Sequence, residues 1–109
     1  SCYEGPVCVF KKDGKLLCRL EGKLSYPMGI SVDEKSIFVA DQLRHCVEVF
    51  AKQGNNKFTY DRSIGGGFGE GEDQLNGPQG VTSSGDNIFV ADTLNNRVQI
   101  YSKSGEHVR

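Results

Sequence analysis

The fold is decided by residues 77–105, GPQGVTSSGDNIFVADTLNNRVQIYSKSG, because residues 26–54, YPMGISVDEKSIFVADQLRHCVEVFAKQG, follow the same pattern. The two stretches align without a gap at an offset of 51 residues, and 11 of the 29 aligned pairs are identical. Ile37–Asp41 recurs unchanged as Ile88–Asp92. Repeats of this length are typical of solenoids, propellers and other arrays, in which one unit cannot bury its apolar faces alone. We therefore expect both units to have the same fold and to stack on each other.

A partial third copy opens the chain. Residues 7–14, VCVFKKDG, align with residues 47–54, VEVFAKQG, at an offset of 40. The missing residues correspond to the Gly-rich, acidic run 65–75, GGGFGEGEDQL, and such insertions usually form loops on one face of an array. The expected organisation is the end of one unit at 1–25, a second unit at 26–64, a Gly-rich linker at 65–76 and a third unit at 77–109 with an incomplete fourth strand.

Each unit is predicted to be all-β. Short strands are expected at 29–32, 36–40 and 46–50, with a candidate fourth at 57–63, because turn-forming residues separate them at the spacing of antiparallel meanders. No window has a clear helical period. The second strand is apolar on both faces, which suits a small antiparallel sheet covered on both sides by other sheets. That arrangement is a β-propeller blade, a four-stranded antiparallel sheet packed between its neighbours.

The third unit resembles a known repeat. Residues 65–108, GGGFGEGEDQLNGPQGVTSSGDNIFVADTLNNRVQIYSKSGEHV, are similar to an NHL repeat, a blade of the six-bladed propellers of tripartite-motif ubiquitin ligases and related post-transcriptional regulators. The second unit departs from this pattern at Arg44-His45 and at Cys46. The matching elements are the Gly-rich lead-in, Pro78-x-Gly80, Val90-Ala91-Asp92, Asn95-Asn96-Arg97-Val98 and Ser104-Gly105.

Two units and a remnant do not close a ring of four to eight blades. We therefore expect the remaining blades to come from the same polypeptide or from further copies, and three copies would supply six. The net charge is −1 with 25% charged residues and no block of like charge, so no strong field favours nucleic acid or a membrane. The sequence shows no signal peptide and no apolar run long enough to cross a bilayer, and a cytoplasmic location is expected.

The four cysteines are expected to be reduced thiols. Cys2, Cys8, Cys18 and Cys46 contain no C-x₂-C pair, and only two histidines accompany them, so we predict no structural zinc site. The Gly-rich run also fails the G-x-G-x-x-G phosphate fingerprint. No metal or cofactor is therefore predicted.

The candidate site is one rim of the propeller, where the loops between second and third strands meet the loops that enter each first strand. Arg44 and His45 replace the turn-favouring Asn95 and Asn96 of the other unit, so turn geometry alone is not expected to explain them. Arg, His, Asn and Tyr suit single-stranded RNA and suit a protein partner equally well. The predicted rim residues are Tyr26, Met28, Gln42, Arg44, His45, Asn76, Gln79, Thr93, Asn95 and Asn96.

The resemblance implies a structural role for Asp92 and Arg97, which would tie the loop between two strands through a charge-assisted hydrogen bond. In the second unit Asp41 faces Cys46 instead, so we expect its partner to be Arg44 or a backbone donor.

The predicted function is a non-catalytic module that binds RNA or protein, within a larger scaffold or ubiquitin ligase of the tripartite-motif kind. The alternative is part of a metal-dependent propeller enzyme, since peptidyl-α-hydroxyglycine amidating lyases resemble NHL propellers. Those enzymes place a metal-binding His just after the Pro of the first strand. Met28 and Gln79 occupy these places here and supply no imidazole.

Overall fold

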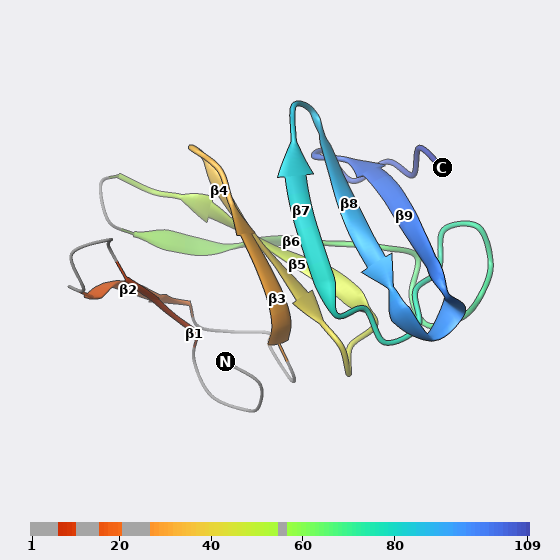
Figure 1. The fold of residues 1–109 in the computed structure, drawn as a ribbon. Helices are drawn as coiled ribbons and strands as arrows, with labels where there is room; N and C mark the ends of the chain where they lie inside the picture. The colour runs from red at the N-terminus through yellow and green to blue at the C-terminus, as the bar shows by residue number, and fades with distance from the viewer. Residues whose placement is uncertain (1–6, 11–15, 21–26, 55–56) are drawn as a thin grey trace.

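The computed structural model describes residues 7–10, 16–20, 27–54 and 57–109, and in the first two segments only the backbone. Tyr26 and Cys2 lie outside the described residues. The described elements are strands and one short 3₁₀-helix (Figure 1). They are β1 (Val7–Phe10), β2 (Leu16–Leu20), β3 (Pro27–Val32), β4 (Ser36–Asp41), β5 (Cys46–Lys52), β6 (Phe58–Ile64), β7 (Gly80–Ser84), β8 (Asn87–Asp92), η1 (Thr93–Asn95) and β9 (Arg97–Ser102).

The strands form three antiparallel sheets, in the orders β1-β2, β3-β4-β5-β6 and β7-β8-β9. Neighbours in each sheet are neighbours in the chain, which is the meander expected of a blade. The register repeats as well, because Asp41 pairs with Cys46 in the second sheet and Asp92 pairs with Arg97 in the third. The prediction of an all-β fold built from open, blade-like sheets is confirmed.

The second and third sheets approach most closely at their first strands, β3 and β7, which lie side by side in Figure 1. Ser31 Oγ lies 2.8 Å from Ser83 Oγ across this contact. A Cβ atom on Gly29 would lie 2.7 Å from the carbonyl oxygen of Gln79 and 2.8 Å from the Cα of Gly80. Only glycine fits at position 29 without moving one backbone away from the other.

The main core lies between these two sheets. Alternating side chains of β4 and β5 on one side meet alternating side chains of β7, β8 and β9 on the other, as expected for stacked blades. The fully or almost fully buried members are Phe38, Ala40, Val47, Val49 and Ile64 from the second sheet, Leu75 from the Gly-rich segment, and Val81, Ile88, Val90 and Tyr101 from the third. A smaller cluster of Ile37, Val39 and Phe50 fills the opposite face of the second sheet, with Phe58 and Tyr60 against it.

The third sheet keeps one apolar face exposed. We call this surface the open face; it carries Thr82, Phe89, Ala91, Val98 and the half-buried Ile100. The residues aligned with Phe89, Ala91 and Val98 in the second unit are Phe38, Ala40 and Val47, and all three are buried under the third sheet. Equivalent positions therefore have opposite environments in the two units.

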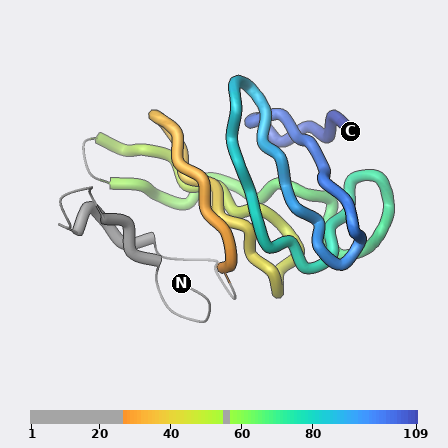
Figure 2. Tube along the Cα trace, in the orientation of Figure 1, coloured from red at the N-terminus to blue at the C-terminus, as the bar shows by residue number. Residues whose placement is uncertain are grey.

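The Gly-rich segment 65–76 connects the second and third sheets. Figure 2 shows it as a green loop that passes around the outer edge of the third sheet, beside β9. Leu75 at its end is completely buried, and Leu75 N donates to Gly67 O at 2.9 Å. The segment is therefore part of the packed structure, in addition to joining two blades.

Candidate functional site

The candidate site lies at the lower end of the molecule in Figure 1, where the β4–β5 and β8–β9 loops turn. We define the rim as residues 42–45, residues 93–96 and Phe68, which contacts the first loop. His45 and Asn96 are equivalent positions in the repeat, and both have a left-handed backbone with φ of 54°. His and Asn are among the residues that tolerate this conformation best. Turn geometry therefore explains His45 as well as Asn96. This corrects the expectation that turn geometry alone would not explain His45.

His45 also links the first loop to the third unit. Its Nδ1 accepts a hydrogen bond from the backbone N–H of Gly77 at 3.0 Å. The imidazole packs on the ring of Phe68, with centroids 4.6 Å apart and the planes 52° from parallel. Phe68 is 64% exposed. Sequence reasoning missed it because it treated residues 65–76 as a linker, although a single aromatic between Gly67 and Gly69 was the signal.

Arg44 pairs with a buried carboxylate. Its Nε donates to Glu48 Oε2 at 3.2 Å, and the side chain of Glu48 is completely buried. The same carboxylate accepts from Tyr60 Oη at 3.1 Å and from Ser63 Oγ. For Asp41 the sequence left Arg44 or a backbone donor as the expected partner, and the structure adds Glu48 as the residue that receives the Nε–H of Arg44. A buried carboxylate needs such donors because burial removes its hydration.

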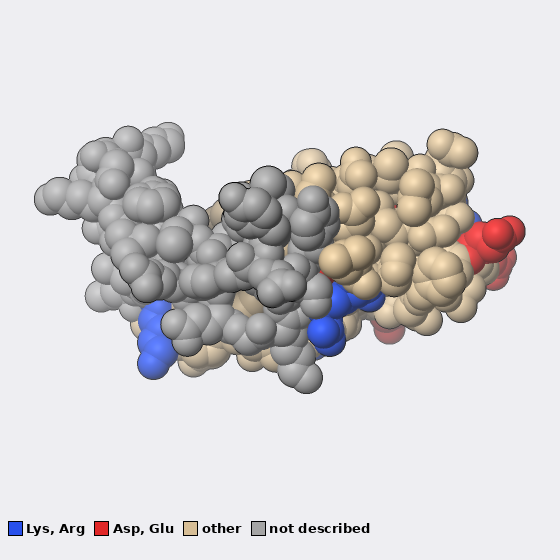
Figure 3. All heavy atoms as spheres, turned by 90° about the horizontal axis from the view of Figure 1, so that it is seen from below, with Lys and Arg blue, Asp and Glu red and all other residues tan. Residues whose placement is uncertain are grey.

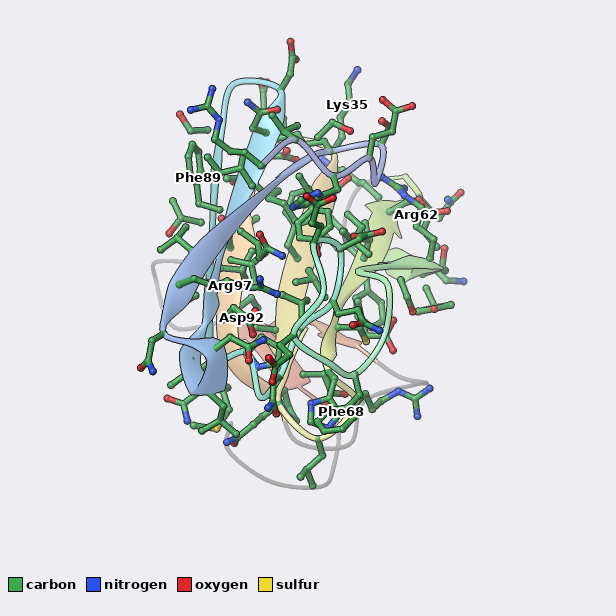
Figure 4. The ribbon with its side chains drawn as sticks, turned by 90° about the vertical axis from the view of Figure 1, so that its right-hand side faces the viewer. Lys35, Arg62, Phe68, Phe89, Asp92 and Arg97 are labelled. Atoms are coloured by element: carbon green, nitrogen blue, oxygen red, sulfur yellow. The ribbon has the colours of Figure 1, made fainter. Side chains whose placement is uncertain are left out.

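Asp92 and Arg97 are joined directly, and Figure 4 shows the two side chains together above Phe68. Arg97 Nε donates to Asp92 Oδ2 at 2.8 Å, and Asp92 is completely buried. Asp92 also accepts from Asn76 N at 2.7 Å and from Asn95 Nδ2 at 2.9 Å. Three donors therefore hold this carboxylate at the junction between the Gly-rich segment and the third sheet.

Side chains of the third unit hold the Gly-rich segment by its carbonyl groups. Both terminal nitrogens of Arg97 reach it, with Nη2 donating to Gly71 O and to Gln74 O at 2.7 Å each. The remaining contacts run from Asn95 Nδ2 to Gly69 O (2.9 Å), from Gln99 Nε2 to Glu72 O (2.6 Å) and from Tyr101 Oη to Asp73 O (3.2 Å). Burial, with the nearby charge of Asp73, raises the pKa of Tyr101, so the phenol stays a donor.

The other predicted site residues are dispersed along this end. Met28 is exposed on β3, and Gln42 is half-buried beside Gly77. Gln79 is exposed, and its backbone N donates to Ala91 O at 3.2 Å. Thr93 Oγ1 also donates to Ala91 O, at 3.4 Å.

Two exposed leucines belong to the rim and were missed. Leu43 is 62% exposed and Leu94 is 61% exposed. They are equivalent residues, separated by the repeat offset of 51, so each loop presents one leucine at the same place. Their identity in both units was a usable signal, but we attributed it to the repeat rather than to a surface.

In the described part of the chain, no three His, Cys, Asp or Glu side chains gather so as to hold a metal ion. Cys46 is a buried free thiol, and burial, with the charges of Glu48 and Asp41, raises its pKa to about 12. A thiol of that kind is a poor nucleophile near neutral pH. Among the described elements no helix has the length and apolar character needed to cross a membrane.

Stacked antiparallel sheets with a recurring loop rim define a propeller-type repeat protein. Residues 75–101 match the family model of the NHL repeat. The chain is also similar to Protein brain tumor of Drosophila melanogaster, with 33% identity over 94 residues, which cover 83% of this chain and 9% of that protein. The chain is therefore an NHL-repeat protein built from propeller blades, and it spans about a tenth of the length of that relative.

Proposed function

We propose that this NHL-repeat chain is a non-catalytic binding module that uses its rim to hold an RNA or protein partner. One observation carries the proposal. The two rim loops share a left-handed residue, His45 in one and Asn96 in the other, while most of their other side chains differ. The loops also differ in chemistry, because the second unit has Arg44 where the third has Asn95, and the Arg44 side chain stays exposed while its Nε pairs with Glu48.

A metal-dependent propeller enzyme is the other function that the resemblance allows. No observation on the described residues favours it. Met28 and Gln79 stand where the amidating lyases carry histidine, and a thioether and an amide are poor zinc ligands. We therefore propose a non-enzymatic role, in the cytoplasm and within a larger scaffold of the tripartite-motif kind.

The experiment exchanges the chemistry of one loop for that of the other. The loop-swap variant carries Arg44→Asn, His45→Asn and Glu48→Gln, so that the second unit has the residues of Asn95, Asn96 and Gln99. Asn keeps the left-handed turn, and Gln removes the buried charge that would lose its arginine. The free energy of unfolding should therefore stay within about 1 kcal/mol of the wild type.

Binding is then measured on the whole chain with a random single-stranded RNA pool and with a random peptide library. The proposal predicts that ligands selected by the wild type bind the loop-swap variant about 1–3 kcal/mol more weakly. Unchanged affinity for every selected RNA and peptide would contradict it.

A further inference from the structure

We infer that the rim binds a segment of a protein partner. Apolar side chains of that segment contact Leu43, Phe68 and Leu94, and a Lys or Arg at one of its ends pairs with Glu70 and Glu72. This inference rests on the proposed function and assigns the class of ligand. It depends on three features of the rim, namely its exposed apolar side chains, the pairing of its arginines and the acidic residues at one end.

The apolar side chains come first. Leu43, Phe68 and Leu94 are each more than 60% exposed. Leu94 lies next to Gly77, because its Cδ1 would be 3.0 Å from a Cβ there, and Gly77 N binds His45, which packs on Phe68. Leu94 and Phe68 are thus linked through one set of contacts across two blades, and Leu43 lies two residues before His45 in the same loop. Exposed apolar groups clustered in this way mark a protein-binding surface.

The positive charge at this end is already compensated. Arg44 pairs with Glu48 and Arg97 pairs with Asp92, and both carboxylates are completely buried. Arg97 spends its remaining donors on carbonyl groups of the Gly-rich segment. RNA affinity comes largely from Lys and Arg that neutralise phosphates, and these two guanidinium groups are each already paired with a carboxylate, so they contribute little to that role.

Acidic residues lie at one end of the same face. Glu70 and Glu72 are exposed, and Gly69 between them and Phe68 is tied to Asn95 of the rim. Figure 3 shows this face from below, with Asp and Glu gathered at one end of the described surface and Lys and Arg only in separate spots. Phosphates would be repelled at that end, whereas a basic residue of a peptide would be attracted.

The test uses the whole chain and three variants. Leu43→Ser with Leu94→Ser removes both leucines, and Glu70→Gln with Glu72→Gln removes the acidic end. Val108→Ser is the control, because Val108 is also an exposed apolar residue but lies outside the rim, beside β9, where its backbone N donates to Ile100 O at 2.7 Å. Thermal unfolding should be nearly unchanged in all three, since every substituted side chain is exposed.

Peptides selected from a random library on the wild type should be rich in apolar residues with Lys or Arg toward one end. We expect their affinity to fall about tenfold or more in the double leucine variant, severalfold in the double glutamate variant, and not at all in Val108→Ser. Failure to select any peptide that depends on the leucines overturns the inference.

The RNA arm separates this failure from that of the proposed function. One outcome is selective binding of RNA whose affinity falls steeply with added salt and in the loop-swap variant but not in the double leucine variant. That outcome would overturn the inference of a protein partner and would still support a binding rim. If neither RNA nor peptide binding responds to any rim variant, both proposals fail.

Discussion

Phe38 and Phe89 occupy the same position in successive units, yet Phe38 is 1% exposed and Phe89 is 36% exposed. The third sheet covers the face that carries Phe38, and Figure 4 shows Phe89 on the outer side of that third sheet. Within the described residues no sheet covers the open face. Because its apolar residues are the repeat equivalents of a formed interface, the open face has the chemistry of a blade-to-blade contact.

The first prediction concerns the closest approach of the sheets. Gly29→Ala should destabilise the chain by about 2 kcal/mol, because the new methyl would meet backbone atoms of Gln79 and Gly80 that cannot move independently. Gly80→Ala is the matched control. It is the equivalent residue of the third unit, and its added Cβ would lie 3.6 Å from the Cβ of Ala91, an ordinary contact. Urea unfolding measures both, and equal losses would show that Gly29 is not restrained by the neighbouring sheet.

A second prediction concerns Asp92 and Arg97. Arg97→Ala should lower the free energy of unfolding by more than the ion pair alone contributes, since Arg97 also binds carbonyl groups of the Gly-rich segment. In a double-mutant cycle with Asp92→Ala, the two losses should fall short of additivity by about 1–2 kcal/mol. Strict additivity would mean that the contact contributes nothing to folding.

The third prediction is a pH dependence at Asp33. Although partial burial acts to raise it, the pKa of Asp33 lies below its ordinary value because Lys103 and the backbone N–H groups of Lys35 and Ser36 bind the carboxylate. Lys103 Nζ lies 2.7 Å from Asp33 Oδ2, so this pair bridges the second and third sheets. A lowered folded-state pKa stabilises the fold above the unfolded pKa, and that contribution is lost as pH falls through the folded value.

Asp33→Asn should therefore cost about 0.5–1 kcal/mol at neutral pH and progressively less below about pH 4. Chemical unfolding of both proteins from pH 7 down to the acid limit gives the comparison. A difference that stays constant with pH would show that the charge of Asp33 has no part in it.

Sequence patterns predicted the strands well, because strand order and register depend on local features that recur in both units. The pairing of Asp41 with Cys46 and of Asp92 with Arg97 follows from the shared spacing. Burial was less predictable. Val47 and Val98 are the same residue at equivalent positions of the repeat, but Val47 is completely buried under a neighbouring sheet and Val98 is 60% exposed. The number of stacked sheets decides which faces are covered, and that number cannot be predicted from a local sequence pattern.

The rim was predicted only in part for a related reason. Loop positions follow from the repeat, so the placement of Arg44, His45, Asn95 and Asn96 at one end could be inferred. The partners of these side chains could not, since Glu48 and Phe68 become neighbours of the rim only when the second sheet and the Gly-rich segment fold against it. Long-range contacts of this kind have no signature in sequence spacing.

The central claim is that NHL-type blades of this chain stack through equivalent apolar faces and that the open face accepts a further blade. Light scattering combined with binding of an apolar dye tests it most directly. We predict that the wild-type chain self-associates or binds the dye, and that Phe89→Ser with Val98→Ser on the open face reduces whichever is seen. A compact, stable wild-type monomer that binds no dye would contradict the claim.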